Sequence, residues 1–253
     1  MDTQRHNGKT AIVTGAGSGI GQATLIRLAA EGATVTGCDI NSESLDSTRA
    51  LLEKQNLSAK LVVANVTQQV DIDALADSLK GQLDILANVA GIMDHFVPLG
   101  ELSDELWERV IDVNLNGVMR LTRAVLPLME KAGRGAIVTV ASEAALGAGA
   151  SGASYTVSKN GVIGLVKHVA YFYGPKGIRS NSVLPGPVAT GIGTSASPDS
   201  SWAMERASLK FATMPPAPAK PDQIATVISW LASEEASNVN GALVTSDGGW
   251  SAA

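Results

Sequence analysis

Cysteine is nearly absent from this sequence: Cys38 is the only one among 253 residues. No disulfide can form within the chain, which fits a reducing compartment. The first segment, Met1–Lys9, is polar and lacks the apolar core of a secretory signal. There is also no run of about 18 or more apolar residues, the length that a membrane-spanning helix needs. We therefore expect a cytoplasmic protein that does not cross a membrane.

Positive charge is also scarce. The chain has 19 Lys and Arg residues against 24 Asp and Glu, a net charge of −5 at pH 7. Clustered Lys and Arg bind nucleic-acid phosphates, so a nucleic-acid partner is disfavoured, as is a strongly acidic carrier protein. The sequence has no metal-ligand spacing of His, Cys, Asp or Glu, no GxSxG motif and no P-loop. We expect a small-molecule substrate and no metal site.

Short apolar runs alternate with helical patterns along the chain. Near-continuous apolar runs are typical of strands covered on both faces. The sequence predicts strands at Ala11–Thr14, Thr34–Cys38, Leu61–Ala64, Ile85–Asn88, Ala136–Val140, Ser180–Leu184 and Leu243–Ser246. It predicts helices at Ile20–Glu31, Ser42–Gln55, Ile72–Lys80, Asp104–Lys131, Ser154–Phe172 and Asp222–Ser233.

This alternation predicts an α/β fold: a Rossmann-type, doubly wound parallel sheet of about seven strands in a three-layer αβα arrangement. No composition break marks a linker, so we expect residues 1–253 to form a single domain. Gly32, Gly81 and Gly174 follow predicted helices and are candidates for left-handed caps. Pro221 stands where a first helical turn would begin.

A glycine-rich turn, Thr14–Gly21, follows the first predicted strand and opens the first helix. Glycines let the backbone pass close to a pyrophosphate, and the helix N-terminus favours its charge. Asp39 ends the second strand, 20 residues after Gly19, where an acid can bind ribose hydroxyls. Each feature also has a purely structural explanation: a tight turn, and an acid that caps the turn before Asn41 and Ser42.

Tyr155 and Lys159 lie four residues apart, so both share one face of the predicted helix. A lysine ammonium one turn from a phenol favours the phenolate and lowers its pKa, toward the range used in general acid/base work. A surface Tyr/Lys pair would give the same pattern if it stood alone. Two further polar residues accompany it: Ser142, which follows the fifth strand 13 residues before Tyr155, and Asn114 within the long helix.

Together these motifs resemble the short-chain dehydrogenase/reductase family, in its compact single-domain branch. Residues 14–21 match its TGxxxGIG turn, residues 155–159 its YxxxK motif, and the likeness runs from Lys9 to Trp250. The resemblance implies an enzyme that moves a hydride between a nicotinamide ring and a carbinol or carbonyl carbon. Its implied catalytic residues are Asn114, Ser142, Tyr155 and Lys159.

The resemblance also implies a role for each of these four residues. Tyr155 exchanges a proton with the substrate oxygen, and Ser142 orients that oxygen. Lys159 also reaches the nicotinamide ribose, and Asn114 holds a water that links Lys159 to solvent. A capping serine and a structural asparagine that kinks its helix are the alternative readings, which all four residues at family spacing disfavour.

The cofactor contacts implied by the family are spread over six segments. Val188 is expected to bind the nicotinamide carboxamide through its backbone, within a PGxVxT-like turn. Two positions depart from the family: Val89 replaces the second Asn of its NNAG motif, and Asn65 replaces an Asp whose contact with adenine it can still make. The implied contacts are Gly15, Ser18, Gly19, Ile20, Gly21, Asp39, Ile40, Asn65, Val66, Asn88, Ala90, Gly91, Tyr155, Lys159, Pro185, Gly186, Val188 and Thr190.

Cofactor choice follows from Asp39, which would repel the 2′-phosphate of NADP, so the sequence predicts NAD. A 3-ketoacyl-thioester reductase is the second enzyme reading, but that subgroup usually uses NADPH, and neither Ser18 nor Ile40 is basic. An enoyl reductase would use a longer Tyr-to-Lys spacing. A catalytically idle nucleotide-binding regulator stays open as a reading of another class, because fold does not guarantee activity.

The irregular stretch Gly191–Lys220 lies where the family places a substrate lid. A short helix there would group apolar residues such as Trp202 and Leu209, which would equally suit a surface helix packed on the domain. Arg206 and Lys210 are expected to face water, so no buried Arg invites a carboxylate. We expect a neutral, apolar secondary alcohol or ketone, possibly cyclic. The predicted substrate contacts are Met93, Ser142, Ala144, Ser151, Tyr155, Gly186 and Trp202.

Family members pair through two long helices, here Asn116–Lys131 and Ser154–Phe172. The second of these has an apolar face larger than one sheet contact needs, formed by Val162, Leu165, Val166, Val169 and Phe172. The alternative is that this face simply packs on the sheet. We expect a homotetramer, or at least a dimer.

Overall fold

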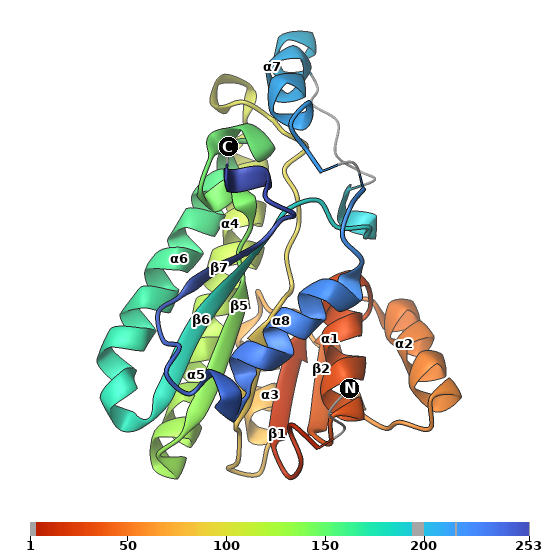
Figure 1. Cartoon of the computed structure of the whole chain (residues 1–253), viewed down its shortest axis with the longest axis vertical. Helices are drawn as coiled ribbons and strands as arrows, with labels where there is room; N and C mark the ends of the chain where they lie inside the picture. The colour runs from red at the N-terminus through yellow and green to blue at the C-terminus, as the bar shows by residue number, and fades with distance from the viewer. Residues whose placement is uncertain (1–3, 194–199, 216, 253) are drawn as a thin grey trace.

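Seven parallel strands make one sheet in the computed structural model, which describes residues 4–193, 200–215 and 217–252 (Figure 1). Their spatial order is β3-β2-β1-β4-β5-β6-β7, and every neighbouring pair is parallel. The strands are β1 (Thr10–Thr14), β2 (Thr34–Asp39), β3 (Lys60–Val63), β4 (Ile85–Asn88), β5 (Gly135–Val140), β6 (Ile178–Pro185) and β7 (Leu243–Ser246). The predicted doubly wound sheet is confirmed.

Helices cover both faces of the sheet. Leu28 of α1 and Ile228 of α8 pack with α2 on one face, and Ile72 of α3, Val125 of α5 and Val169 of α6 pack on the other (Figure 1). The helices are α1 (Gly19–Ala30), α2 (Ser42–Lys54), α3 (Gln69–Asp77), α4 (Asp104–Ile111), α5 (Gly117–Ala132), α6 (Ala153–Tyr173), α7 (Ser201–Phe211) and α8 (Pro221–Ala232). The predicted three-layer arrangement is therefore present.

The long helix predicted over Asp104–Lys131 is not a single α-helix. A π-helical turn, Asp112–Asn116, separates α4 from α5. Such turns often occur at functional sites. This one carries Asn114, and it precedes Gly117, where a Cβ would come within 2.9 Å of the Val66 side chain. Close packing against the loop after β3 thus accompanies the local change of helix geometry.

Two of the three predicted glycine caps have the expected left-handed backbone. Gly32 and Gly81 have φ values of 94° and 86°. The prediction for Gly174 is wrong: its φ is −54°, and the chain continues into a 3₁₀ turn, Gly174–Lys176. Gly177 takes the left-handed conformation instead, where an added Cβ would lie 2.2 Å from the carbonyl oxygen of Gly133.

The order of the strands reverses beside β1, since β2 lies on one side of it and β4 on the other. Chain crossovers leave β1 and β4 toward opposite faces of the sheet, so a crevice opens at their carboxyl ends. The glycine turn after β1 and the loop after β4 meet there: Thr14 Oγ1 accepts hydrogen bonds from the backbone N–H groups of Val89 and Ala90 at 2.9 and 3.0 Å.

The apolar face of α6 packs mainly on its own sheet. Val162, Val166 and Val169 are buried in the core, so for them the expectation of a spare apolar face is wrong. Phe172 remains 58% exposed, and Tyr171 beside it is 78% exposed. Val157, near the start of the helix, is 45% exposed, so exposed apolar side chains lie toward both ends of α6. No helix within residues 4–193, 200–215 and 217–252 is long and apolar enough to cross a membrane.

Candidate active site

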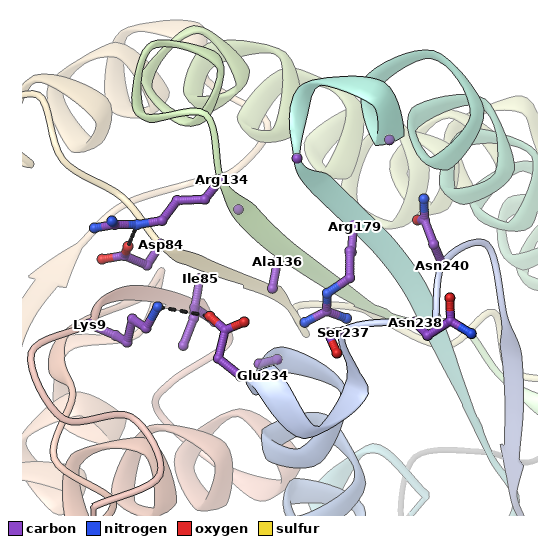
Figure 2. Close-up of a pocket in the computed structure, with 14 residues that line it drawn as sticks. Lys9, Asp84, Ile85, Arg134, Ala136, Arg179, Glu234, Ser237, Asn238 and Asn240 are labelled. Carbon is purple, nitrogen blue, oxygen red and sulfur yellow. Dashed lines mark hydrogen bonds and ion pairs between the residues drawn. The ribbon is translucent and has the colours of Figure 1, made fainter.

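Two hollows lie at opposite ends of the sheet. The hollow at the amino ends of β4, β5 and β6 has a volume of about 390 Å³ and is lined by charged side chains (Figure 2). Figure 2 shows Arg134 turned toward Asp84 and Lys9 toward Glu234, with N–O distances of 2.8 and 3.1 Å. Arg179 donates to backbone carbonyl groups at the end of α8. The cations of this hollow are thus committed to protein partners.

The hollow at the carboxyl ends of the strands is larger, about 590 Å³, and lies at the reversal of strand order. Of the predicted cofactor contacts, Asn88 alone does not line it. The predicted contacts that line it are Gly15, Ser18, Gly19, Ile20, Gly21, Asp39, Ile40, Asn65, Val66, Ala90, Gly91, Tyr155, Lys159, Pro185, Gly186, Val188 and Thr190.

The glycine turn forms one wall of this cavity and allows a close backbone approach. Gly15 has φ +69°, and a Cβ on it would lie 3.0 Å from the Cα of Ala90. At Gly21 a Cβ would lie 2.0 Å from the carbonyl oxygen of Gly15, so any side chain there would push the turn away from α1. The first N–H groups of α1 have no intrahelical partners, and Ser18 makes no side-chain cap bond. This cradle fits a pyrophosphate.

Asp39 stands at the end of β2 and lines the cavity. One carboxylate oxygen accepts from the N–H of Gly17 at 3.0 Å and the other from the N–H of Asn41 at 3.0 Å. Asn41 in turn caps α2 by accepting from the N–H of Ser44. Asp39 therefore does stabilise the turn before α2, as the alternative reading of the sequence suggested. The same hydrogen bonds fix its carboxylate at the cavity wall, in a position that fits a ribose.

Two predicted contacts have other partners. Asn88 is buried and donates to the hydroxyls of Thr122 and Thr139, at 3.2 and 3.4 Å, so it joins β4 to α5 and β5. Asn65 does line the cavity, but its side-chain oxygen accepts from the N–H and the hydroxyl of Thr67, at 3.0 and 2.9 Å. An adenine amino group would have to share that oxygen.

Three of the four predicted catalytic residues meet at the inner end of the cavity. Tyr155 and Lys159 are 8% and 3% exposed, and both line the cavity with Ser142, which follows β5. The Lys159 ammonium lies 5.4 Å from the centre of the Tyr155 ring and donates to the carbonyl of Val140 at 2.9 Å. Ser142 also accepts from the N–H of Ala144 at 3.1 Å, so the capping role coexists with its place in the site.

Asn114 is fully buried behind this group and does not line the cavity. Its side-chain oxygen accepts from the N–H of Ile92 at 2.8 Å, and its NH₂ group donates to the Ile92 carbonyl at 2.9 Å. The NH₂ group also donates to the Ser158 hydroxyl at 3.2 Å. Asn114 thus holds the loop after β4 against α6.

Burial dominates the ionisation of the Tyr/Lys pair. It raises the pKa of Tyr155 to about 12, an effect that a hydrogen bond from Ser142 opposes and the charge of Asp94 reinforces. Burial also lowers the pKa of Lys159 to about 8. The sequence-based expectation of a lowered Tyr155 pKa is therefore wrong for this structure. The ammonium lies over the phenol ring and is bound to Val140, so the lost hydration of the phenolate outweighs it.

Of the predicted substrate contacts, Ser142, Tyr155 and Gly186 line the cavity. Met93 and Ala144 do not line it, but they pack in one apolar cluster with Tyr155 and Val110 of α4. Ser151 shares a 2.8 Å hydrogen bond with the Thr156 hydroxyl, and Trp202 is 57% exposed; neither of these two lines the cavity.

The stretch Gly191–Lys220 contains the expected short helix, α7, whereas residues 194–199 and 216 lie outside the described residues. Ala203 and Ala207 form the buried face of α7, and Leu209 is exposed. The expectation that Lys210 faces water is wrong. Its ammonium lies 2.7 Å from Glu143 and 4.7 Å from the centre of the Trp250 ring, because the carboxylate of Glu143 is buried and needs a counter-charge.

Some cavity-lining residues were not foreseen from the sequence. Ile92 and Ile192 add apolar surface, and Arg109, exposed on α4, adds a cation to the wall. The helical pattern of α4 shows which face is apolar but not which exposed residue borders a cavity, so no sequence signal marks Arg109.

Known proteins resemble this chain over its whole length. The family model described as "Enoyl-(Acyl carrier protein) reductase" matches residues 15–251. The 3beta-hydroxysteroid dehydrogenase 2 of Eggerthella lenta is 38% identical over 260 residues, covering 100% of both chains. The 3-oxoacyl-[acyl-carrier-protein] reductase FabG of Thermotoga maritima is 38% identical over 253 residues, covering 97% of this chain and 98% of its own.

A solved structure agrees with these relatives. A 7 alpha-hydroxysteroid dehydrogenase complexed with NADH and 7-oxo glycochenodeoxycholic acid superposes with a TM-score of 0.85 at 30% identity, covering 98% of this chain and 96% of that one. The sheet order, the cavity at its carboxyl edge and the matched sequences all agree. The chain belongs to the short-chain dehydrogenase/reductase family and is an oxidoreductase that uses a nicotinamide cofactor and acts on CH–OH groups.

Proposed function

We propose that this enzyme interconverts a neutral, cyclic, mostly apolar secondary alcohol and its ketone, with NAD(H) as the cofactor. One observation carries the proposal: the buried group of Tyr155, Lys159 and Ser142 opens onto the same cavity as the glycine turn and Asp39. A dinucleotide along this cavity would therefore run from an acidic ribose site to a proton donor.

The proposed chemistry assigns one task to each side chain. When bound, the nicotinamide cofactor supplies or accepts the hydride. The Tyr155 hydroxyl gives a proton to the carbonyl oxygen in reduction and takes it from the alcohol in oxidation. Ser142 donates a hydrogen bond that orients the substrate oxygen. Lys159 binds the cofactor ribose, and Asn114 holds a water that links Lys159 to solvent.

The preference for NAD(H) rests on Asp39. Its carboxylate is held by two backbone N–H groups at 3.0 Å, so it cannot swing away from a ribose 2′ position without losing both bonds. A 2′-phosphate there would face a fixed like charge. Ile40, which follows it along the cavity wall, provides no cation to compensate.

The substrate class rests on the apolar surface near Tyr155. Ile92, Met93 and Val110 lie in or beside the cluster that contains its ring, and all three are apolar. Arg109 lines the same cavity but is exposed, so it is not a buried partner for a substrate carboxylate. Two relatives are named as hydroxysteroid dehydrogenases, which supports a fused-ring substrate.

A panel of four compounds tests the assignment: cyclohexanol, a 3β-hydroxysteroid, gluconate and a 3-hydroxyacyl thioester. Oxidation would be followed by NADH absorbance, with NADP⁺ in parallel. We expect the highest kcat/KM with the steroid and NAD⁺. The highest kcat/KM with gluconate would contradict the apolar substrate, and equal use of NADP⁺ would contradict the role of Asp39.

A 3-oxoacyl-thioester reductase is the second candidate, favoured by the similarity to the FabG protein. The absence of basic residues at Ser18 and Ile40 disfavours it, because such enzymes need cations near the 2′-phosphate. The thioester in the panel separates the two functions. A catalytically idle protein would bind NADH without turning over any of the four compounds.

Four further proposals accompany this function. Residues of about 191–220 form a lid over the substrate, in one domain that spans 1–253. Copies of the chain associate through α5 and α6 into a homotetramer, or at least a dimer, and a light-scattering mass near the 26.0 kDa monomer would be the contradicting result. Cell fractionation would test the cytoplasmic location that we propose.

A further inference from the structure

A fully buried carboxylate stands beside the site and has no part in the chemistry proposed above. Asp94 lies in the loop after β4, five residues past Val89, and its side chain has no exposed surface. A buried carboxylate is costly unless hydrogen bonds and opposite charge compensate it. The partners of Asp94 therefore indicate why the chain keeps an acid there.

Those partners are concentrated at the start of α6. One carboxylate oxygen accepts from the N–H of Gly152 at 2.9 Å. The other accepts from the N–H of Tyr155 at 2.8 Å and from the hydroxyl of Ser154 at 3.1 Å. Asp94 thus caps a 21-residue helix from a distant loop, and the first turn that it caps contains the tyrosine. No side-chain cap comes from Gly152 itself.

The approach of the loop to the helix is close. A Cβ at Gly152 would lie 2.6 Å from a carboxylate oxygen of Asp94, so glycine is required there. The two residues that follow Asp94, His95 and Phe96, have φ values of 56° and 60°, which residues other than glycine rarely adopt. The tertiary structure therefore maintains an unfavourable backbone where it brings Asp94 to α6.

The backbone of Tyr155 is held from both sides. Asp94 accepts from its N–H, and the Ser158 hydroxyl donates to its carbonyl at 2.8 Å. Ser158 itself accepts from Asn114, which binds the backbone of Ile92 in the same loop. Two chains of hydrogen bonds thus connect the loop after β4, which borders the cofactor cavity, to the peptide groups of one residue.

We propose that Asp94 is a positioning residue: its carboxylate fixes the first turn of α6, and with it the Tyr155 hydroxyl, relative to the cofactor-binding edge of the sheet. This inference rests on the proposed role of Tyr155. It extends that role by naming the group that sets where the tyrosine stands and how readily it ionises.

Charge makes the inference testable through pH. The main cause of the raised Tyr155 pKa is burial, and the negative charge of Asp94 raises it further. Removing that charge should lower the pKa toward its ordinary value, so oxidation should reach a given fraction of its maximum at lower pH. Charged or titratable side chains on the elements packed around the start of α6 include Asp94, His95, Asp104, Glu105, Glu108, Arg109, Asp112, Glu143 and Lys159, of which those at 95, 104, 105, 108 and 109 are exposed.

The experiment compares Asp94→Asn with wild type and with Ser154→Ala. Asparagine keeps the shape but replaces one of the two acceptor oxygens with an NH₂ donor, so the N–H of Gly152 or that of Tyr155 loses its acceptor, and the negative charge is removed. We expect amide hydrogen exchange across residues 152–158 to speed up at least about tenfold, and kcat with NAD⁺ and a 3β-hydroxysteroid to fall at least about tenfold. KM and the Kd for NADH should stay within about twofold of wild type, because the cavity walls remain. The pH profile of oxidation should move to lower pH.

Ser154→Ala removes one hydrogen bond and leaves the charge. It should slow kcat a few-fold without moving the pH profile. If Asp94→Asn does not fold, Ser154→Ala decides: slower turnover at unchanged KM supports positioning, and wild-type turnover overturns it.

Folded Asp94→Asn with the wild-type kcat and pH profile also overturns the inference. Tyr155→Phe, measured in parallel, distinguishes a failure of the proposed function from a failure of the positioning role of Asp94. If it stays active, the proposed function fails; if it is inactive while Asp94→Asn behaves as wild type, only the positioning role fails.

Discussion

Helix α6 carries a tyrosine and lysine pair near each of its ends. At its start, the Lys159 ammonium lies 5.4 Å from the centre of the Tyr155 ring; just past its end, the Lys176 ammonium lies 5.4 Å from that of Tyr173. The first pair is buried at the carboxyl edge of the sheet, and the second is half-buried to exposed at the amino edge. The same contact therefore exists in two environments on one helix.

The two environments shift the pKa values of the two lysines in opposite directions. Burial lowers the pKa of Lys159 to about 8, whereas the hydrogen bond and charge of Glu130 raise the pKa of Lys176. Reactivity near neutral pH thus depends on the loss of water around the pair and not on the ring contact.

The two hollows repeat this contrast. At the amino edge, Asp84 and Glu234 neutralise Arg134 and Lys9 (Figure 2). At the carboxyl edge, Lys159 lines the cavity and donates to the backbone carbonyl of Val140, and no carboxylate among the described residues forms an ion pair with it. Paired charges stabilise the fold, and a buried cation without a carboxylate partner is available to a ligand.

The largest expected difference between the two ends of α6 is in the effect on kcat of removing the hydroxyl of Tyr155 or of Tyr173. Tyr155→Phe should lower kcat by about 10²–10⁴-fold while the Kd for NADH stays near wild type, because only the proton-transferring oxygen is lost. Steady-state kinetics and NADH fluorescence titration measure the two quantities. Tyr173→Phe is the matched control and should leave both unchanged. If the Tyr155→Phe enzyme kept most of its activity, the claim that only the buried tyrosine is catalytic would be wrong.

The next effect concerns the acids at the two edges. Asp39→Ala should reduce the ratio of kcat/KM for NAD⁺ over NADP⁺ by about 10²-fold, since like charges at a recognition site cost several kcal/mol. Kinetics with both cofactors measure it. Asp84→Asn at the amino edge should leave that ratio unchanged. It should instead lower the free energy of unfolding by about 1–3 kcal/mol in urea titration, because its partner Arg134 loses a charged acceptor. A wild-type enzyme indifferent to the cofactor would refute the first expectation.

The pH dependence of the two reaction directions should differ. Oxidation needs the phenolate of Tyr155, whose pKa is about 12, so kcat/KM for the alcohol should rise about tenfold per pH unit from pH 6 to 8. Reduction needs the protonated phenol and should stay level over that range. Above pH 8, where Lys159 loses its proton, oxidation should rise less steeply and reduction should decline. Initial rates at saturating cofactor measure the profiles, and a level oxidation profile would be the contradicting result.

The smallest effect concerns the lid. Trp202→Ala should raise KM for a 3β-hydroxysteroid roughly fivefold, which corresponds to about 1 kcal/mol of aromatic contact, and leave KM for cyclohexanol unchanged. Tyr171→Ala, another exposed aromatic residue, is the control and should change neither. Equal KM changes for both alcohols would show that Trp202 serves the packing of α7 and not the substrate.

Local patterns were sufficient to predict the sheet and most of the cofactor wall. Strands and helices have backbone periods of about 2 and 3.6 residues, which can be recognised in a sequence alone. These periods identified the strand runs and the i, i+4 pair of Tyr155 and Lys159, and the spacing of the glycines identified the turn between the first strand and the first helix. Asp39 was predicted for the same reason, since it ends a strand beside the glycine turn. The sequence did not show that the Asn88 side chain binds Thr122 and Thr139 and does not line the cavity, because these partners lie far along the chain.

The sequence by itself therefore determined the fold class, the glycine cradle and the residues gathered at the inner end of the cavity. Only the tertiary structure decided the direction of the Tyr155 pKa shift, the ion pair of Lys210 with the buried Glu143, and the cap that Asp94 places on α6. These properties depend on how much water is removed around a group and on which distant segment reaches it. Both arise from packing between parts of the chain that no local pattern connects.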